Sequence, residues 1–335
     1  RTLRLSALLL VAQDERAPVL VPDGGTAVAP VIIYQNSNLC AWRYDFTLPA
    51  RAQTGYSVGG TQYPVCGDIF GDMRIGYVSC NGEAQESLSP ADERRNDMWK
   101  RLANEHQAAP FHLLLHGGDQ IYADGILDVN SRIRRWRERE SRPYNDEAFS
   151  SEMHEAAENF LVEHYCELYR QPHTAHMLAR VPNLMIWNDH DIVDGWGSFN
   201  SWRLDSPVGE GVFALAREMF LLFQMGHAAG EQPVLGSDAS GRTLTWTAKF
   251  PDLCIIAPDL RSERTPEQVL GEAGWGALRQ AFEQTEASAR VLMLASVPLI
   301  APKFGLIDRI LRALPFQTGF EGDVHDQRQA QARRP

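Results

Sequence analysis

The sequence predicts an α/β fold preceded by a small all-β unit, because the pattern of apolar residues changes once along the chain. Residues 1–72 consist of short apolar or alternating runs separated by turn residues such as PDGG and GG. This spacing is typical of a small antiparallel, immunoglobulin-like β-sandwich. From residue 73, strand-like runs alternate with helix-like segments, the pattern of an α/β domain. We therefore expect an N-terminal β-sandwich at residues 1–72 and a second domain at residues 73–335.

The strands expected in the first domain lie in the runs LRLSALLLVA, APVLVP, PVIIYQNSNLCAWRYDFTL and TGYSVGG. Residues 5–12 (LSALLLVA) follow two arginines, as the apolar part of a signal peptide does, but no small-residue cleavage site with a clear break follows. We interpret this run as a β-strand.

In the second domain, residues 111–116 (FHLLLH) are almost entirely apolar, as expected for a strand covered on both faces. Further strands are predicted at residues 74–79, 183–187 and 291–297, with a hairpin formed by TLTWTAKF and LCIIAPDL. Helices are predicted at residues 90–107, within the charged segment 128–180, and at 212–226 and 275–285. The chain lacks an initiator Met and ends in the polar stretch QRQAQARRP. We expect a fragment whose catalytic domain is truncated at its C-terminus.

Composition restricts the class of protein. The hydrophobic content of 44% and charged content of 22% are ordinary for a globular protein. The net charge is −11 with basic residues spread along the chain, so binding to nucleic acid is not expected. No apolar run is long enough to span a membrane. Five widely spaced cysteines without a CxxC motif do not form a disulfide framework. Because this count is odd and no intact leader is present, we expect a cytoplasmic rather than an exported protein. The sequence does not indicate the oligomeric state.

Potential metal ligands follow three predicted strands: CNGE, GGDQIYAD and NDHDIVDG. In an open α/β sheet, ligands bind at the carboxyl ends of the strands. Two glycines allow a sharp turn before Asp119, whose carboxylate could bridge two cations as in two-metal hydrolysis. Tyr122 could coordinate as a phenolate beside a strong Lewis acid such as Fe³⁺. Alternatively, Asp119 is a capping residue and Tyr122 packs in the core.

The loop NDHDIVDG gathers four titratable groups within six residues. Asp189 could ligate a metal, and His190, kept cationic by carboxylates, could protonate a leaving alkoxide. The alternative is a polar turn with an N-capping aspartate. Cys80, directly after a strand, could bind iron or zinc as a thiolate. Alone it would be interpreted as a small buried side chain, but its position facing the other two loops favours a ligand.

The motifs SCNG, GGDQIYAD, IWNDHD and APDLRSERT resemble those of the alkaline phosphatase D (PhoD-like) metallophosphatases, relatives of the purple acid and calcineurin-like phosphatases. The resemblance covers about residues 73–300. It implies a four-layer α/β/β/α sandwich with an N-terminal β-sandwich before it. It also implies that Asp119 bridges the metals, that Tyr122 binds ferric iron, and that Cys80 is an iron ligand where many relatives use aspartate.

By the same resemblance, Asp189 takes the place of the ligating Asn of the GNH[DE] motif, and His190 matches the adjacent histidine. Arg261 or Arg264 would bind substrate phosphate through a bidentate fork. The alternative for these arginines is a surface ion pair with Asp259 or Glu263.

Two departures from the family pattern affect the ligand set. Asn188 stands where relatives often have a second aspartate. The family completes its site with a GD-x-H loop after a late strand, and residues 322–325 (GDVH) match only in letters. The flanking LPFQTGFE and DQRQAQARR do not have the pattern of that setting, so we interpret GDVH as a chance match and expect the true loop beyond Pro335.

The sequence thus predicts metal-dependent hydrolysis of small phosphoric esters, diesters or monoesters, by a metal-activated hydroxide. The expected cofactors are Fe³⁺ and Ca²⁺, with Mn²⁺ or Zn²⁺ as other candidates. The alternative is a catalytically incomplete fragment that binds metal or phosphate without turnover. A zinc amide hydrolase is disfavoured, because no HExxH or His-rich ligand set is present.

Overall fold

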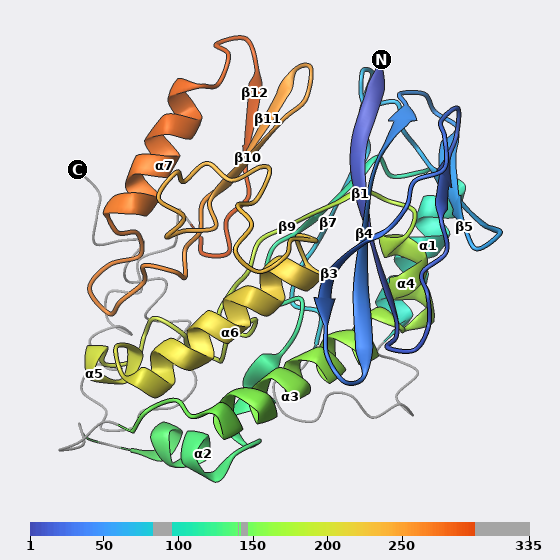
Figure 1. The fold of residues 1–335 in the computed structure, drawn as a ribbon. Coiled ribbons are helices and arrows are strands. Elements are labelled where there is room, and N and C mark those ends of the chain that lie inside the picture. The colour runs from blue at the N-terminus through green and yellow to red at the C-terminus, as the bar shows by residue number, and fades with distance from the viewer. Residues whose placement is uncertain (83–95, 140, 142–146, 299–335) are drawn as a thin grey trace.

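The chain forms a mixed α/β structure with four small sheets, seen here in a computed structural model (Figure 1). The structure describes residues 1–82, 96–139, 141 and 147–298. The strands are β1 (Thr2–Ala12), β2 (Leu20–Pro22), β3 (Val31–Gln35), β4 (Leu39–Pro49), β5 (Thr54–Val58), β6 (Thr61–Val65), β7 (Ile75–Val78), β8 (Leu113–His116), β9 (Asn183–Met185), β10 (Trp246–Lys249), β11 (Leu253–Ala257) and β12 (Arg290–Met293). The helices are α1 (Asp97–Ala108), the 3-10 helix η2 (Ala123–Leu127), α2 (Ser131–Glu138), α3 (Ser151–Tyr169), α4 (Pro172–Leu178), α5 (Ser201–Leu204), α6 (Pro207–Phe223) and α7 (Glu272–Glu283).

The N-terminal strands form two three-stranded antiparallel sheets, in the orders β1-β4-β3 and β2-β5-β6. The strand interpretation of residues 5–12 is confirmed, because β1 pairs with β4 along its whole length, from Thr2 opposite Pro49 to Ala12 opposite Leu39. Leu20, Tyr44 and Leu48 are buried in the core of this unit. Its immunoglobulin-like character and the boundary at residue 72 stay predictions.

Strands β7, β8 and β9 form a parallel sheet in which β8 is central and fully buried. The register pairs Val78 with His116 and His116 with Met185. Consequently the segments that follow these strands begin at one edge of the sheet, as expected for parallel strands. The predicted alternation of strands and helices in this region is confirmed.

Strands β10 and β11 form the predicted antiparallel hairpin, and β12 adds to it in parallel. Leu113 and Leu115 of β8 share a buried cluster with Trp246 and Ile255 of this second sheet. Helices lie against the other faces: the cluster around Leu114 includes residues of α1 and α4, and the cluster of Cys254 and Ile256 includes Ala281 of α7. The α/β class is therefore confirmed, whereas the full four-layer stack stays a prediction.

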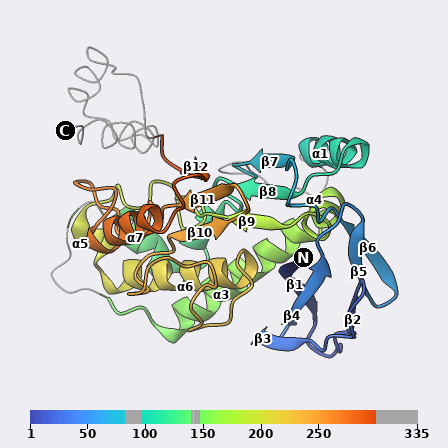
Figure 2. The ribbon, with the colours of Figure 1, turned by 90° about the horizontal axis from the view of Figure 1, so that it is seen from above.

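The long helices α3 and α6 share a third hydrophobic cluster with α2, η2 and part of β4. Figures 1 and 2 show α3 and α6 running beside one another, with the N-terminal strands at one end of the molecule and α7 near the other. Helix α6 begins five residues earlier than predicted. Ser206 caps it by accepting a hydrogen bond from the Gly209 N–H, and Pro207 occupies its first turn.

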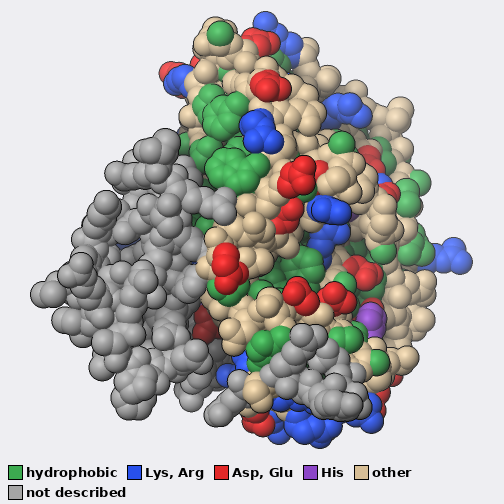
Figure 3. All heavy atoms as spheres, turned by 90° about the vertical axis from the view of Figure 1, so that its left-hand side faces the viewer, with side chains coloured by type: hydrophobic (Ala, Val, Ile, Leu, Met, Phe, Trp, Pro, Cys, Tyr) green, Lys and Arg blue, Asp and Glu red, His purple; other side chains and the backbone are tan. Residues whose placement is uncertain are grey.

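Several further observations concern the surface. On the face shown in Figure 3, acidic and basic side chains are interspersed with hydrophobic ones. Among the residues that the structure describes, no helix is both long and apolar enough to cross a membrane. The segment 322–325 (GDVH) lies outside the described residues.

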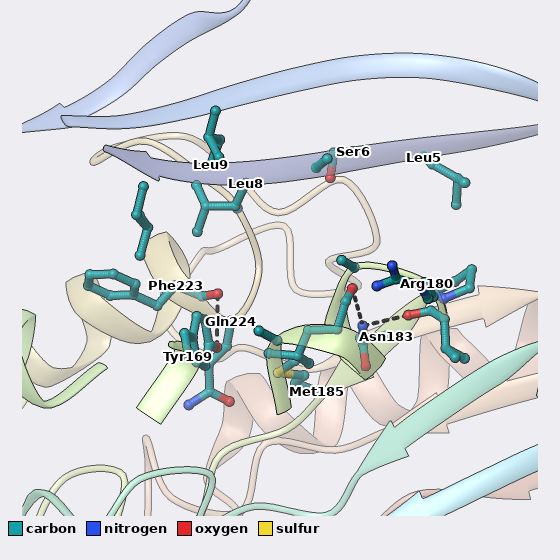
Figure 4. Close-up of a pocket in the computed structure, with 18 of the residues that line it drawn as sticks. Leu5, Ser6, Leu8, Leu9, Tyr169, Arg180, Asn183, Met185, Phe223 and Gln224 are labelled. Atoms are coloured by element: carbon teal, nitrogen blue, oxygen red, sulfur yellow. Dashed lines mark hydrogen bonds between the residues drawn. The ribbon is translucent and has the colours of Figure 1, made fainter. Parts of the chain in front are cut away.

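A cavity of about 490 Å³ lies between β1 and a floor formed by parts of α3, α4, β9 and α6 (Figure 4). Leu8 and Leu9 belong to the strand above it, and Tyr169, Asn183 and Gln224 to the floor. None of the predicted metal ligands lines this cavity. It is separate from the edge of the β7–β9 sheet where those residues gather.

Candidate active site

The loops after β7, β8 and β9 meet at one edge of the sheet. The backbone N–H of Cys80 donates to the carbonyl of Gly118 (3.1 Å), and that of Asn81 donates to the carbonyl of Asp119 (2.8 Å). Gly118 has φ +99°, and a Cβ there would lie 2.5 Å from the Asn188 Cβ. Only glycine fits this position, because both the backbone angle and the close approach exclude a side chain.

Cys80 and Asp119 both have left-handed backbone conformations, with φ +56° and +55°. They are the only non-glycine residues with positive φ among those that the structure describes. Such a conformation is unfavourable for residues with a side chain and is concentrated at functional sites. Two of the four predicted metal ligands thus occupy the two described non-glycine positions that carry this backbone strain.

Cys80, Asp119 and Tyr122 converge in the structure. The Cys80 thiol donates a hydrogen bond to Asp119 Oδ2 (3.4 Å), and the Tyr122 hydroxyl is hydrogen-bonded to the Cys80 sulfur. Gly82 makes room for the phenol ring, because a Cβ at this position would lie 2.6 Å from Tyr122 Cδ2. Three of the four predicted ligands are therefore brought together around one point.

The electrostatics of this group favour a cation. Burial, and then the nearby Asp189 carboxylate, raise the pKa of Asp119. Burial, followed by Asp119 and Cys80, raises the pKa of Tyr122, and burial raises the pKa of the Cys80 thiol. All three groups become anionic on ionisation, and the charge of Asp119 disfavours the ionisation of both Cys80 and Tyr122. A positive ion among them would remove this penalty.

Asp189, the fourth predicted ligand, has different neighbours. Its Oδ1 accepts a hydrogen bond from Arg261 Nη2 (3.2 Å), and its Oδ2 accepts one from the Gly195 N–H (2.9 Å). Burial would raise the pKa of Asp189, but Arg261, His190 and these hydrogen bonds outweigh it and lower the pKa. Asp189 is therefore a carboxylate held ionised by the protein itself.

Arg261 and Arg264 are buried, with 1% and 3% of their surface exposed. The Arg261 guanidinium donates from Nε and Nη2 to Asn188 Oδ1 (2.8 and 2.5 Å) and from Nη1 to the carbonyl of Trp196. Both arginines are therefore inside the protein rather than at its surface, and Asp259 accepts the Arg261 backbone N–H (2.9 Å). In this arrangement Arg261 holds the loop after β9 in place. A contact between either arginine and substrate stays a prediction.

His190 lies beside the converging ligands. Its ring is 4.2 Å from that of Tyr122, centroid to centroid, and its Nδ1 is 2.7 Å from Asp124 Oδ2. Burial alone would lower the pKa of His190, but the hydrogen bond and charge of Asp124, with Asp189 and Asp119, raise it to about 9. The imidazole is therefore held as a cation at neutral pH, as a proton donor requires.

Two residues of the candidate site had no assigned role in the sequence analysis. Asp124 holds His190 and also accepts the Asp194 N–H (2.7 Å). Its position five residues after Asp119 in the motif DQIYAD was the available signal. Asp191 is buried and accepts the backbone N–H groups of Asp119 and Asn188 (2.8 Å each). The sequence offered no signal for this role beyond its position next to His190.

The donor chemistry fits a metal ion in part. Carboxylate, thiolate and phenolate together suit iron, and Cys80, Asp119 and Tyr122 supply these groups. However, within the described ranges no three His, Cys, Asp or Glu side chains are grouped so that they could hold a metal ion. The described residues thus supply donor groups that suit iron, but not a complete set of ligands.

Comparison with known proteins shows a similar fold and then the family. A solved structure titled "Structure of PhoD" has a similar fold, with a TM-score of 0.51 and 14% sequence identity, over 90% of this chain and 61% of that chain. The family model described as PhoD related phosphatase matches residues 40–320. The chain therefore belongs to the PhoD related phosphatase family.

A curated relative from Saccharomyces cerevisiae, the uncharacterized protein YGR266W, is 24% identical over 318 residues. The match covers 81% of this chain and 44% of the yeast protein. The chain thus spans less than half the length of this curated relative and about three fifths of the PhoD chain.

Proposed function

We propose that this chain hydrolyses phosphoric esters with metal ions held by Cys80, Asp119, Tyr122 and Asp189. The observation that carries the proposal is the convergence of Cys80, Asp119 and Tyr122 at the edge of a parallel sheet, with His190 beside them. Membership of a phosphatase family supports the reaction class. The proposal includes the four-layer α/β/β/α fold for the catalytic domain.

His190 is the proposed proton donor to the leaving alkoxide. Its Nδ1 is occupied by Asp124, which orients the ring and favours its protonated form. Its Nε2 lies 3.8 Å from Asp194 Oδ1, beyond hydrogen-bond distance. This nitrogen is therefore the atom that can give a proton to the ester oxygen as the bond to phosphorus breaks.

Bound cations would neutralise phosphate charge and lower the pKa of a coordinated water. The proposed ions are Fe³⁺ and Ca²⁺, with Mn²⁺ or Zn²⁺ as other candidates. Cys80 and Tyr122 would hold the iron, and the Asp119 carboxylate would contribute to holding the ions. Arg261 is proposed to keep Asn188 and Asp189 in place rather than to bind phosphate, because protein acceptors already occupy its three guanidinium nitrogens.

The test measures hydrolysis of a chromogenic phosphodiester and the matching phosphomonoester by protein stripped of metal and then reloaded with each candidate ion. Metal-dependent release of the chromophore is expected. His190→Asn should lower kcat by about 10²- to 10⁴-fold, whereas Cys80→Ser should lower metal content and leave the fold intact. Activity in the stripped protein, or full activity of both variants, would contradict the proposal.

The second candidate function is binding of metal or phosphate without turnover. It is favoured by the incomplete ligand set among the described residues. The same assay on a chain extended to the length of the curated yeast relative separates the two functions. Activity only in the longer chain would favour the binding role for this one.

A further inference from the structure

Asp191 makes five hydrogen bonds although only 1% of its surface is exposed. Its Oδ2 accepts the N–H groups of Asp119 and Asn188 at 2.8 Å each. Its Oδ1 accepts the N–H groups of Gln120 (3.1 Å) and Ile121 (3.4 Å) and the side-chain amide of Gln224 (2.9 Å). All five partners are donors, so this carboxylate is fully engaged inside the protein.

Three of these donors are consecutive in the chain. The N–H groups of residues 119–121 point toward one carboxylate because Asp119 has a left-handed backbone angle of +55°. Successive N–H groups in such a turn form a concave anion site. Asp191 fills this site, and the resulting bonds offset the strain of placing a non-glycine residue there.

The fourth backbone donor belongs to the other loop. Asn188 follows β9, whereas residues 119–121 follow β8, so one carboxylate joins the two loops that carry Asp119 and Asp189. Gln224, at the end of α6, holds Asp191 from behind and also donates to the Tyr165 hydroxyl (3.0 Å). The spacing of the two loops is therefore tied to the helical core.

We propose that Asp191 is a positioning residue that fixes the Asp119 turn against the Asp189 loop, and thereby sets the geometry of the metal-binding groups. It acts through backbone N–H groups and touches neither substrate nor metal. The inference rests on the proposed function, because its consequence is a defined separation of the proposed ligands.

The variant Asp191→Asn keeps size and shape but replaces one accepting oxygen by an NH₂ group. Because every partner of Asp191 is a donor, the new NH₂ would face at least two donors in either orientation. In metal-free protein, hydrogen exchange of a peptide covering residues 117–123 should become about tenfold faster or more. The affinity for Co²⁺, used as the probe ion, should fall about 10- to 100-fold.

The absorption spectrum of bound Co²⁺ distinguishes a change in the position of the proposed ligands from a general loosening of the loop. A sulfur-to-cobalt charge-transfer band reports whether Cys80 is still a ligand, and we expect it to weaken or shift in Asp191→Asn. The matched control is Asp238→Asn. Asp238 also accepts several donors, the N–H and hydroxyl groups of Ser240 and Thr243 at 2.6–3.0 Å, but none of these belongs to the candidate site. The control should leave exchange at 117–123 and the Co²⁺ spectrum unchanged.

If Asp191→Asn does not fold, Gln224→Met takes its place, since it removes one donor to Asp191 and keeps an unbranched side chain. It should weaken Co²⁺ binding about two- to fivefold. Wild-type exchange rates and wild-type Co²⁺ affinity in a folded Asp191→Asn protein would overturn the inference while the proposed function stands. A wild-type chain that binds no Co²⁺ and hydrolyses no ester would overturn both.

Discussion

Two regions of the molecule are built alike: the loops after β8 and β9 form the first, and the loop after β11 forms the second. They have opposite effects on the ionisation of nearby carboxyl groups. Each is organised by a buried carboxylate that accepts backbone N–H groups: Asp191 in the first region and Asp259 in the second. Asp259 also accepts the indole N–H of Trp187 (2.8 Å), which ties the β11 loop to the end of the β7–β9 sheet. In both regions a buried carboxylate thus holds the backbone in place.

The side chains that the two regions present are different. The β8 and β9 loops bury Asp119 close to Asp189, and burial, followed by the charge of Asp189, raises the pKa of Asp119. The β11 loop turns the Arg261 guanidinium inward, where it lowers the pKa of Asp189. Ionisation of Asp119 in the first region therefore disfavours the folded state, and Arg261 in the second region contributes stability by compensating the charge of Asp189. This division can be tested by changing one residue at a time.

The largest effect is expected for Asp119→Asn. Activity should fall about 100- to 1000-fold, because a charged group at the reacting centre is lost. Stability of the metal-free protein at pH 7 should be unchanged or higher. A carboxyl whose pKa is raised by folding binds its proton more tightly in the folded state, so its ionisation disfavours that state as pH rises. Steady-state kinetics and thermal unfolding check the two parts, and a clear loss of stability would contradict the comparison.

Arg261→Met should affect stability in the opposite way to Asp119→Asn: we expect a large loss of stability. It leaves the Asp189 carboxylate and the Asn188 amide oxygen buried without their partner. Breaking a buried ion pair by removing one member costs about 3–5 kcal/mol, which denaturant unfolding would measure.

Two further variants calibrate the Arg261 result. Arg290→Met removes an ion pair with Asp252 whose side chains are 75% and 65% exposed, so a loss below about 1 kcal/mol is expected. Adding Asp189→Asn to Arg261→Met should recover part of the lost stability, because the uncompensated charge disappears. Equal losses of stability on replacing the buried and the exposed arginine would show that Arg261 does not stabilise the Asp189 carboxylate.

The sequence predicted which strand ends bring polar side chains together, because that information is local. A buried apolar run followed by Gly-Gly-Asp, or by Asn-Asp-His-Asp, is visible without the fold, and parallel strands bring such ends together. Cys80, Asp119 and Tyr122 were found in this way, and the structure places them in contact. The antiparallel N-terminal strands and the β10–β11 hairpin were predictable from alternation for the same reason.

The direction of side chains was not predictable, since it depends on contacts between distant segments. Arg261 was expected to face substrate or solvent, but Asn188, 73 positions earlier in the chain, accepts from its guanidinium inside the protein. Asp191 and Asp189 are two residues apart and chemically identical, yet Asp191 accepts the backbone N–H groups of both loops, whereas Asp189 pairs with the Arg261 guanidinium. Composition and spacing contain no signal that separates such neighbours.

Within the first region, the hydrogen bond between Asp124 and His190 can be tested by comparing two variants. Asp124→Asn should lower kcat about tenfold, because the imidazole loses the charge that orients and protonates it. Asp194→Asn is the matched control: its carboxylate is 3.8 Å from His190 Nε2 and half exposed, so a change below about twofold is expected. Equal effects on kcat in the two variants would remove Asp124 from the site.

The smallest effect is expected at Gly82, where space rather than charge is tested. In Gly82→Ala the new Cβ would lie 2.6 Å from the Tyr122 ring, so the phenol must move away from Cys80 and activity should fall a few-fold. Gly276→Ala is the control, since nothing lies within 4 Å of its Cβ and the position is inside helix α7. There alanine should stabilise the protein by about 0.5–1 kcal/mol and leave activity unchanged. If Gly82→Ala is as active as Gly276→Ala, the position of the Tyr122 ring does not matter for the reaction, and Tyr122 is not one of the ligands.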